Sequence, residues 1–416
     1  MKTAIDILAL LLLLGPFSPT VRAQNLSLDL TVPEKVGISS DSLRQMDAYF
    51  HRLVDQQQLA GIQTAVMRRG RLIHFDSYGY ANIAEARPLD AQSIFRIFSM
   101  TKPIVTVGLL QLYEAGKFSL ADPLSRYLPE FEHPQVYTDS GPVPAQNPLR
   151  IIDLLRHTSG YSYGVGPYPE LNQMYVDADL REVRDNAEFV RRLSQLPLQF
   201  EPGTDWQYGY STNVCGHLIE VLSGQPLDRY LEEHVLQPLD MQDTHFQLPA
   251  EKIDRFTVGY GWQEEVGLTI VEAQRDNRYI TEVTCFNGGG GLVSTTLDYL
   301  KFCRMIQQKG KANGQRILRP ATVALMLRDQ LGEVRRHQER LRLPPGEAGF
   351  GLGFAIRGAG PQELEPVYGW GGAVGTYFKI DQERNLVYVL MIQLSPYRQL
   401  GLRQLFQDFV EAAVID

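Results

Sequence analysis

The chain has few cysteines, no long basic run and no internal repeat. Its 416 residues include three cysteines, Cys215, Cys285 and Cys303, whose spacing is not that of a metal-binding set. No basic run is longer than Arg335-Arg336 or Arg69-Gly70-Arg71, and the formal net charge is -8, so we expect no nucleic-acid binding. The lack of repeats and low-complexity tracts excludes solenoid and fibrous architectures.

The odd number of cysteines leaves at least one thiol without a partner in the chain. Each cysteine lies in an apolar or glycine-rich context, which favours buried free thiols. Whether two of the three form a disulfide stays open at this stage. The sequence indicates neither a metal nor an organic cofactor.

A long apolar run occurs only at the N-terminus. Lys2 precedes the run Ile7 to Leu14, and Val21-Arg22-Ala23 follows at the usual cleavage spacing. This pattern predicts a secretory signal peptide, residues 1–23, cleaved after Ala23, with an uncleaved N-terminal anchor as the alternative. The run is too short to span a bilayer permanently, so no stable membrane span is expected after cleavage. We therefore expect an exported protein, periplasmic or secreted, with residues 24–416 as a single domain.

Strand-like runs lie near both ends of the chain, and helical periodicity dominates between them. The economical arrangement is one antiparallel sheet built from both ends, with a largely helical inserted part, which is an α+β fold. We expect the sheet part at about 30–98 and 286–416 and the helical part at about 99–285. The clearest runs are strands at 61–67, 72–78, 350–356, 376–380 and 387–392 and a closing helix at 402–414.

A serine and a lysine stand three residues apart where a turn-like segment gives way to an apolar helical pattern. Ser99 and Lys102 would share one face of that helix. A desolvated lysine can accept the proton of a serine hydroxyl and so make the serine a nucleophile. The alternative is an ordinary helix start with a solvated lysine, and the pair alone does not decide between the two.

A second candidate is Tyr208, in the segment from Pro202 to Ser211. A phenol can carry a proton, and we expect a nearby cation such as Lys102 to stabilise the phenolate and lower the pKa of Tyr208. A tyrosine packed at the end of a loop is the alternative.

The third candidate is the glycine-rich stretch Tyr368-Gly369-Trp370-Gly371-Gly372-Ala373-Val374-Gly375-Thr376, which precedes a predicted strand. Glycines at such a place let a ligand approach the backbone closely. Exposed backbone N–H groups there, with the N–H of the nucleophile, would suit an oxyanion hole. A tight bend with a strand bulge is the alternative.

Taken together, the three stretches resemble the serine β-lactamase and penicillin-binding-protein-like superfamily. The resemblance is strongest to the class C β-lactamase-like hydrolases that include the family VIII carboxylesterases. The superfamily carries Ser-x-x-Lys, a tyrosine box and Lys-Thr-Gly or a variant, here Ser99-Met100-Thr101-Lys102, Tyr208-Gly209-Tyr210 and Trp370-Gly371-Gly372. The resemblance extends from roughly residue 35 to the C-terminus, and other stretches typical of the family are 120–129, 154–160 and 288–295.

The resemblance implies a β-lactamase/transpeptidase-like fold and an acyl-enzyme mechanism that needs no cofactor. Ser99 would be the acylated nucleophile, and Lys102 and Tyr208 would share the general base and acid roles. The N–H groups of Ser99 and Ala373 would form the oxyanion hole. His157 belongs to a His-Thr-Ser-Gly turn of the family, and we expect it to be structural.

Two departures from the family pattern bear on the substrate. Tyr210 replaces an expected asparagine, and Trp370 replaces the cation that helps bind the carboxylate of β-lactams. Tyr210, Trp370, Gly371 and Gly372 are therefore candidate substrate-binding residues, and we expect an ester or other neutral small acyl substrate. A β-lactamase or D-Ala-type peptidase is the alternative, followed by a non-catalytic wall- or ligand-binding protein. The oligomeric state stays open.

Overall fold

The computed structural model describes residues 28–275, 277–332, 334, 343, 348–358 and 366–415. The signal peptide predicted for residues 1–23 lies outside this range.

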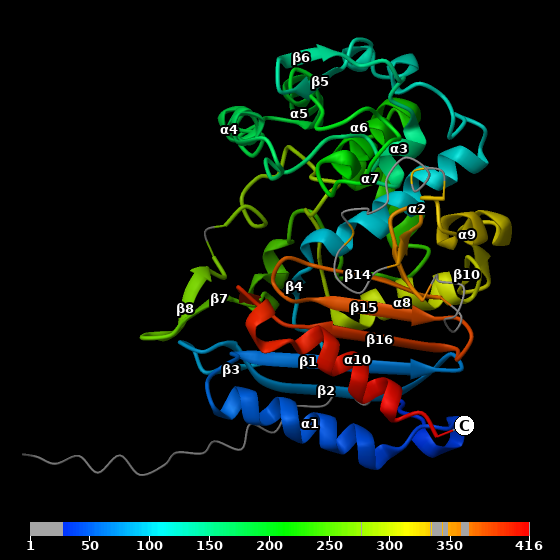
Figure 1. Ribbon diagram of the computed structural model, residues 1–416. Coiled ribbons are helices and arrows are strands. Elements are labelled where there is room, and N and C mark those ends of the chain that lie inside the picture. The colour runs from blue at the N-terminus through cyan, green and yellow to red at the C-terminus, as the bar shows by residue number, and fades with distance from the viewer. Residues whose placement is uncertain are drawn as a thin grey trace, which may run out of the picture.

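An eight-stranded antiparallel sheet unites the two ends of the chain, as the sequence predicts (Figure 1). In spatial order its strands are β12 (Gly349–Phe350), β13 (Ala355–Arg357), β14 (Val367–Gly371), β15 (Tyr377–Asp381), β16 (Leu386–Met391), β1 (Gly61–Arg68), β2 (Arg71–Asn82) and β3 (Arg87–Pro88). The N-terminal hairpin joins the C-terminal strands through β1 and β16, where Ala65 lies opposite Val389. Both strands are fully buried, because helices cover both faces of the sheet.

Two helices from the chain ends, α1 (Ser40–Asp55) and α10 (Leu402–Ala412), pack on one face of the sheet (Figure 1). The α1 helix is amphipathic, and Leu43, Met46 and Phe50 recur at helical spacing on its buried side. Its N-terminus is capped by Ser39, whose hydroxyl accepts a hydrogen bond from the Ser42 N–H at 3.2 Å. The opposite face of the sheet is covered by α8 (Thr296–Gln307), which packs on β1 and β16.

The helical part lies beyond α8, and α2 (Thr101–Glu114) runs through its centre (Figure 1). Nearly every α2 residue from Thr101 to Leu112 is buried. A Cβ at Gly108 would stand 2.7 Å from Leu231, so glycine allows a neighbouring helix to approach closely. The other helices here are α3 (Ile151–Leu155), α4 (Pro169–Asp177), α5 (Asn186–Leu193), α6 (Ser211–Ser223), α7 (Leu227–Leu231) and α9 (Pro320–Leu327).

One local expectation was wrong. The run 350–356 is not one strand but two, β12 and β13, because the chain turns between them at Gly353, where φ is 78°. The largely helical part at 99–285 also contains two hairpins. These are β5 (Gln135–Thr138) with β6 (Gly141–Pro144), and β7 (Gly259–Gln263) with β8 (Gly267–Glu272), the latter joined by β17 (Leu394–Ser395). The remaining short strands are β4 (Phe95–Arg96), β9 (Val293–Ser294), β10 (Lys311–Ala312) and β11 (Gln315–Arg316).

All three cysteines are free thiols, which confirms the preferred interpretation of the sequence. Cys215 and Cys303 are buried, and Cys285 is half-buried. Within the described residues, no helix combines the length and apolar character needed to cross a membrane.

Candidate active site

Ser99 lies in a tight turn between β4 and α2. This turn is the 3-10 helix Phe98–Met100, and α2 follows it directly. It is anchored because β4 pairs with β9 and the Ile97 N–H donates to the Leu292 carbonyl at 3.2 Å. Phe98 has a φ of 42°, a left-handed conformation that costs a non-glycine residue about 1–3 kcal/mol. Strain of this kind directly before the serine is typical of a functional turn.

Lys102 is buried beside Ser99 and has no carboxylate among its hydrogen-bond partners. Its ammonium lies 3.4 Å from the Ser99 hydroxyl and donates to the Tyr163 hydroxyl at 2.9 Å and to the Gly289 carbonyl at 2.5 Å. Its exposed fraction is 1%. Burial lowers the pKa of Lys102 from 10.5 to about 7, because it removes the water that would hydrate the ammonium. The spacing of the two residues therefore places a readily deprotonated amine beside the hydroxyl, as predicted.

Tyr208 faces the same serine, but its pKa moves in the direction opposite to the expectation. A hydrogen bond joins the phenol to Ser99, and the indole N–H of Trp370 donates to the phenol oxygen at 3.0 Å. Desolvation nevertheless raises the pKa of Tyr208 to about 12. Lys102 is not among the groups that lower it, because with a pKa of about 7 this amine is already neutral at the pH where the phenol titrates. Tyr208 is thus a neutral phenol at ordinary pH.

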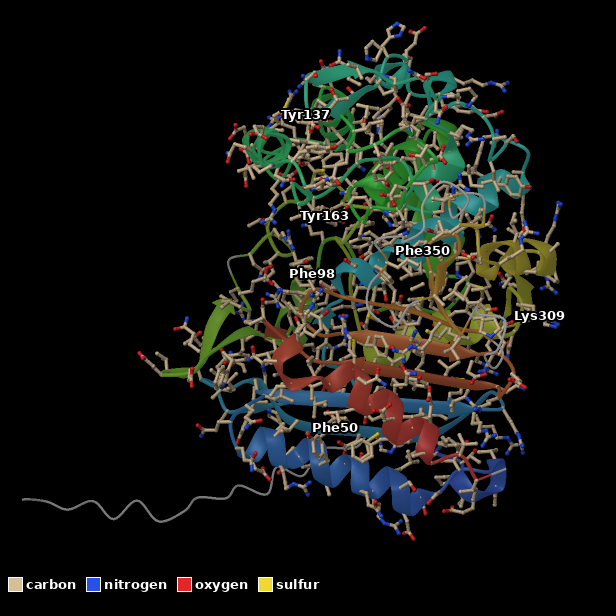
Figure 2. All side chains as sticks on the ribbon, in the orientation of Figure 1. Phe50, Phe98, Tyr137, Tyr163, Lys309 and Phe350 are labelled. Carbon is tan, nitrogen blue, oxygen red and sulfur yellow. The ribbon has the colours of Figure 1, made fainter. Side chains whose placement is uncertain are left out.

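Aromatic rings form the wall of the site, at the junction of the sheet and the helical part. Figure 2 labels Phe98, Tyr163 and Phe350 around this junction. Tyr163 contacts Tyr208 edge-to-face with ring centres 5.5 Å apart, and it contacts Tyr210 in the same way at 4.6 Å. Tyr210 is thus held in the wall, two residues from the phenol that faces Ser99.

The glycines after Trp370 are explained by packing within the protein. A Cβ at Gly371 would stand 2.4 Å from the guanidinium carbon of Arg403, and one at Gly372 would stand 2.5 Å from the Ile97 carbonyl. Arg403, from α10, donates to the Gly372 carbonyl and thus fixes this turn. The protein itself thus fills the side of Gly371 and Gly372 on which a Cβ would project. Ala373, which follows directly, is exposed.

His157 has no catalytic geometry. The residue is buried, and neither ring nitrogen forms a hydrogen bond with a described residue. Its ring packs 4.9 Å from the Tyr208 ring and 5.4 Å from the Phe350 ring. Burial and the nearby Lys102 charge hold the pKa of His157 well below 6.5, so the imidazole is a neutral packing element.

Three residues complete the site through contacts that local patterns do not predict. Tyr163 lies among the tyrosines after the His157 turn, and only the fold brings its hydroxyl to Lys102. Gly289 contributes a carbonyl from a stretch typical of the family. Arg403 is an ordinary basic residue in a helix, remote from every motif. Long-range contacts of this kind cannot be read from local patterns.

The arrangement suits nucleophilic acyl chemistry. It combines a serine hydroxyl, a buried amine of lowered pKa and a neutral phenol, all within contact of one another. No group of three or more potential metal ligands occurs among the described residues.

The chain is similar to known proteins over most of its length. Esterase EstB from Burkholderia gladioli is 30% identical over 371 residues, covering 83% of this chain and 89% of its own. Lovastatin esterase from Penicillium rubens is 28% identical over 383 residues, covering 84% and 92%. Among solved structures, EstCE1, described as a hydrolase with promiscuous acyltransferase activity, has a TM-score of 0.73 at 26% identity and covers 90% of this chain and 98% of its own. The family model described as Beta-lactamase matches residues 46–407, so the chain belongs to the β-lactamase family and is a serine hydrolase.

Proposed function

We propose that this serine hydrolase cleaves small neutral esters or related acyl substrates through a covalent intermediate on Ser99. The observation that carries the proposal is the contact of Ser99 with both Lys102 and Tyr208. Esterase EstB and lovastatin esterase are relatives that cover most of the chain, which supports ester substrates.

In the proposed reaction Lys102 is the base. With a pKa of about 7, a large fraction of this amine is neutral at physiological pH and can accept the proton of the Ser99 hydroxyl. The hydroxyl oxygen then bonds to the acyl carbon, and the ester oxygen departs with a proton. Tyr208 is the candidate donor of that proton, because its phenol is neutral and contacts Ser99. Water next attacks the carbonyl carbon of the acyl-Ser99 ester, and Tyr208 recovers its proton from this water. Lys102 returns its proton to the Ser99 oxygen as that oxygen leaves.

The negative charge on the acyl oxygen would be stabilised by the N–H groups of Ser99 and Ala373. Support comes from the close packing of Gly372 on the Ile97 carbonyl, which fixes the glycine-rich stretch after Trp370 against the turn that carries Ser99. Arg403 restrains the glycine-rich stretch as well, because it donates to the Gly372 carbonyl. Donors held rigidly in this way need no reorganisation as the charge develops.

Trp370 supports an ester rather than a β-lactam substrate. It stands where the resemblance would place a cation for a substrate carboxylate, and its indole N–H is committed to the Tyr208 hydroxyl. A neutral acyl compound loses nothing from the missing cation, whereas an anionic one loses a charge-assisted contact.

A substrate panel tests this proposal. Kinetics on p-nitrophenyl acetate, butyrate and octanoate would be compared with turnover of the β-lactam nitrocefin by the same preparation. We expect kcat/KM for at least one ester to exceed that for nitrocefin by about tenfold or more, since a charge-assisted hydrogen bond is worth more than 1.4 kcal/mol. Faster nitrocefin turnover, or no ester hydrolysis, would overturn the substrate assignment.

We further propose that the protein is exported to the periplasm or secreted, on the sequence pattern of residues 1–23 alone. N-terminal sequencing of the protein recovered outside the cytoplasm should begin at Gln24. A chain that keeps Met1 in that fraction would favour the uncleaved anchor instead.

A further inference from the structure

An arginine that pairs with no carboxylate of the described residues lies behind the glycine-rich stretch after Trp370. Arg403, from α10, donates to the Tyr397 hydroxyl at 2.7 Å. It also donates to the backbone carbonyls of Thr376, at 2.9 Å, and of Gly372. A guanidinium stays protonated at ordinary pH, so this half-buried position carries a permanent positive charge that only neutral oxygens contact.

Arg403 lies on the opposite face of β14 from the Trp370 side chain. Successive residues of a strand point to opposite faces, and the guanidinium carbon of Arg403 stands 2.4 Å from the position of a Cβ on Gly371. The Trp370 side chain points the other way, since its indole N–H donates to the Tyr208 hydroxyl. The strand β14 therefore stands between the guanidinium and the phenol, so Arg403 can act on the reaction through its charge and not by contact.

The charge of Arg403 reaches Tyr208 across this strand. Desolvation raises the pKa of Tyr208 to about 12. Hydrogen bonds from Ser99 and Trp370 oppose that rise, and the charge of Arg403 opposes it too. Charges interact over several ångströms in buried surroundings, where little water screens them. Arg403 thus favours the phenolate form of Tyr208.

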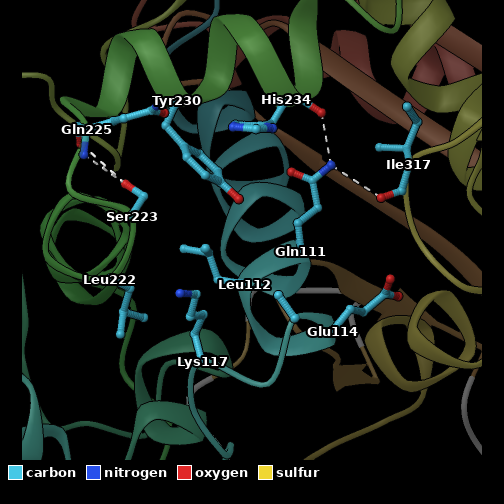
Figure 3. A pocket seen from close by; sticks show the side chains of 11 residues that line it. Gln111, Leu112, Glu114, Lys117, Leu222, Ser223, Gln225, Tyr230, His234 and Ile317 are labelled. Atoms are coloured by element: carbon cyan, nitrogen blue, oxygen red, sulfur yellow. Dashed lines mark hydrogen bonds between the residues drawn. The ribbon is translucent and has the colours of Figure 1, made fainter.

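The helix that carries Lys102 brings no carboxylate to this part of the site. The only acidic residue of α2 is Glu114, which follows Lys102 by twelve residues and so lies roughly 18 Å along the helix from it. Figure 3 shows Glu114 at that far end, where it lines a separate hollow of about 430 Å³ together with Lys117. The effect of Arg403 on Tyr208 is therefore not offset by an acid from α2.

A phenolate forms at Tyr208 in the proposed reaction, and this inference rests on that reaction. When the ester oxygen departs, the O–H bond of Tyr208 breaks, the proton passes to the departing oxygen, and the electron pair stays on the phenol oxygen. We propose that Arg403 is a positioning residue for this step, because its fixed charge stabilises the phenolate and so assists release of the proton. Lys102 carries the Ser99 proton at that moment and returns it during deacylation, whereas Arg403 keeps its charge throughout.

Two esters of the same acid, p-nitrophenyl butyrate and ethyl butyrate, test the proposal on the purified protein. The p-nitrophenolate group is a stable anion that leaves without a proton, whereas ethoxide must be protonated as it leaves. For both esters kcat/KM reports acylation, and a mere loosening of the glycine-rich stretch would lower both values by the same factor.

Four variants separate the charge of Arg403 from its packing. Arg403→Gln and Arg403→Met both remove the charge, so that either one serves if the other does not fold by circular dichroism. Arg403→Lys keeps the charge but loses the planar fork of donors. Arg398→Gln is the matched control, because it removes a positive charge at an exposed position shortly before α10.

We expect Arg403→Gln and Arg403→Met to lower kcat/KM for ethyl butyrate about tenfold more than for p-nitrophenyl butyrate, an effect of about 1.4 kcal/mol on the proton-transfer step. Arg403→Lys and Arg398→Gln should keep the wild-type ratio of the two values. Equal losses on the two esters, or a ratio that Arg403→Lys changes as much as Arg403→Gln does, would overturn the proposal. Hydrolysis of neither ester by the wild type would instead overturn the proposed function, and this inference with it.

Discussion

The pH dependence of ester hydrolysis should report the protonation of Lys102. Burial lowers the pKa of this ammonium from 10.5 to about 7, which corresponds to roughly 5 kcal/mol against the charged form. Only the neutral amine accepts the Ser99 proton, so kcat/KM should rise as the pH rises through 7. The neutral fraction increases from about one tenth at pH 6 to about nine tenths at pH 8, so the rate should rise about tenfold over that interval.

The assay measures initial rates on p-nitrophenyl butyrate from about pH 5.5 to about pH 9.5 at constant ionic strength, with spontaneous hydrolysis subtracted. Tyr208 has a pKa of about 12, so its phenol stays protonated and no decline is expected on the alkaline side of this range. Lys102→Ala should lose most activity and with it the transition near pH 7. A profile that is flat, or that shows no midpoint near pH 7 and is still rising at the alkaline end of the range, would refute the assignment of Lys102 as the base.

Four substitutions probe the remaining contacts. Trp370→Phe removes the N–H that donates to the Tyr208 hydroxyl. The variant should lower kcat/KM about five- to tenfold, which is the contribution of one hydrogen bond. An unchanged kcat/KM would show that this hydrogen bond does not assist proton transfer by Tyr208. Tyr163→Phe removes an acceptor of the Lys102 ammonium, so the pKa of Lys102 should fall further and the midpoint of the pH profile should move down by about one pH unit; an upward movement would contradict this. Tyr208→Phe should lower turnover about a hundredfold, and Tyr210→Phe far less, because only the first phenol contacts Ser99. Equal losses would show that the wrong tyrosine has been assigned.

The sequence predicted the parts of this structure that depend on local pattern. The spacing of Ser99 and Lys102 places both at the start of one helix, and the alternating runs near the chain ends identify the strands of the sheet. The resemblance to the β-lactamase superfamily then predicted that Tyr208 and Trp370 lie at the same site as Ser99. The structure adds that Trp370 is more than an apolar wall, since its indole N–H contacts the Tyr208 hydroxyl.

The remaining features depend on contacts between distant segments. The pKa of Tyr208 was expected to fall, but desolvation raises it, and the buried Lys102 is already neutral at the pH where the phenol titrates. The glycines after Trp370 were expected to admit a ligand, and the structure adds a second reason for a glycine at Gly371, since Arg403 fills the position of a Cβ there. In each case the residue type was informative, and the partner that determines its role comes from another part of the chain.

Labelling with a fluorophosphonate probe tests the central claim most directly. The phosphonyl group would be located by mass spectrometry of peptides from the wild type and from Ser99→Ala, with circular dichroism to show that both are folded. We predict one adduct, on Ser99, and none on the folded Ser99→Ala variant. An adduct on another residue, or equal labelling of the two proteins, would contradict the role of Ser99 as the nucleophile.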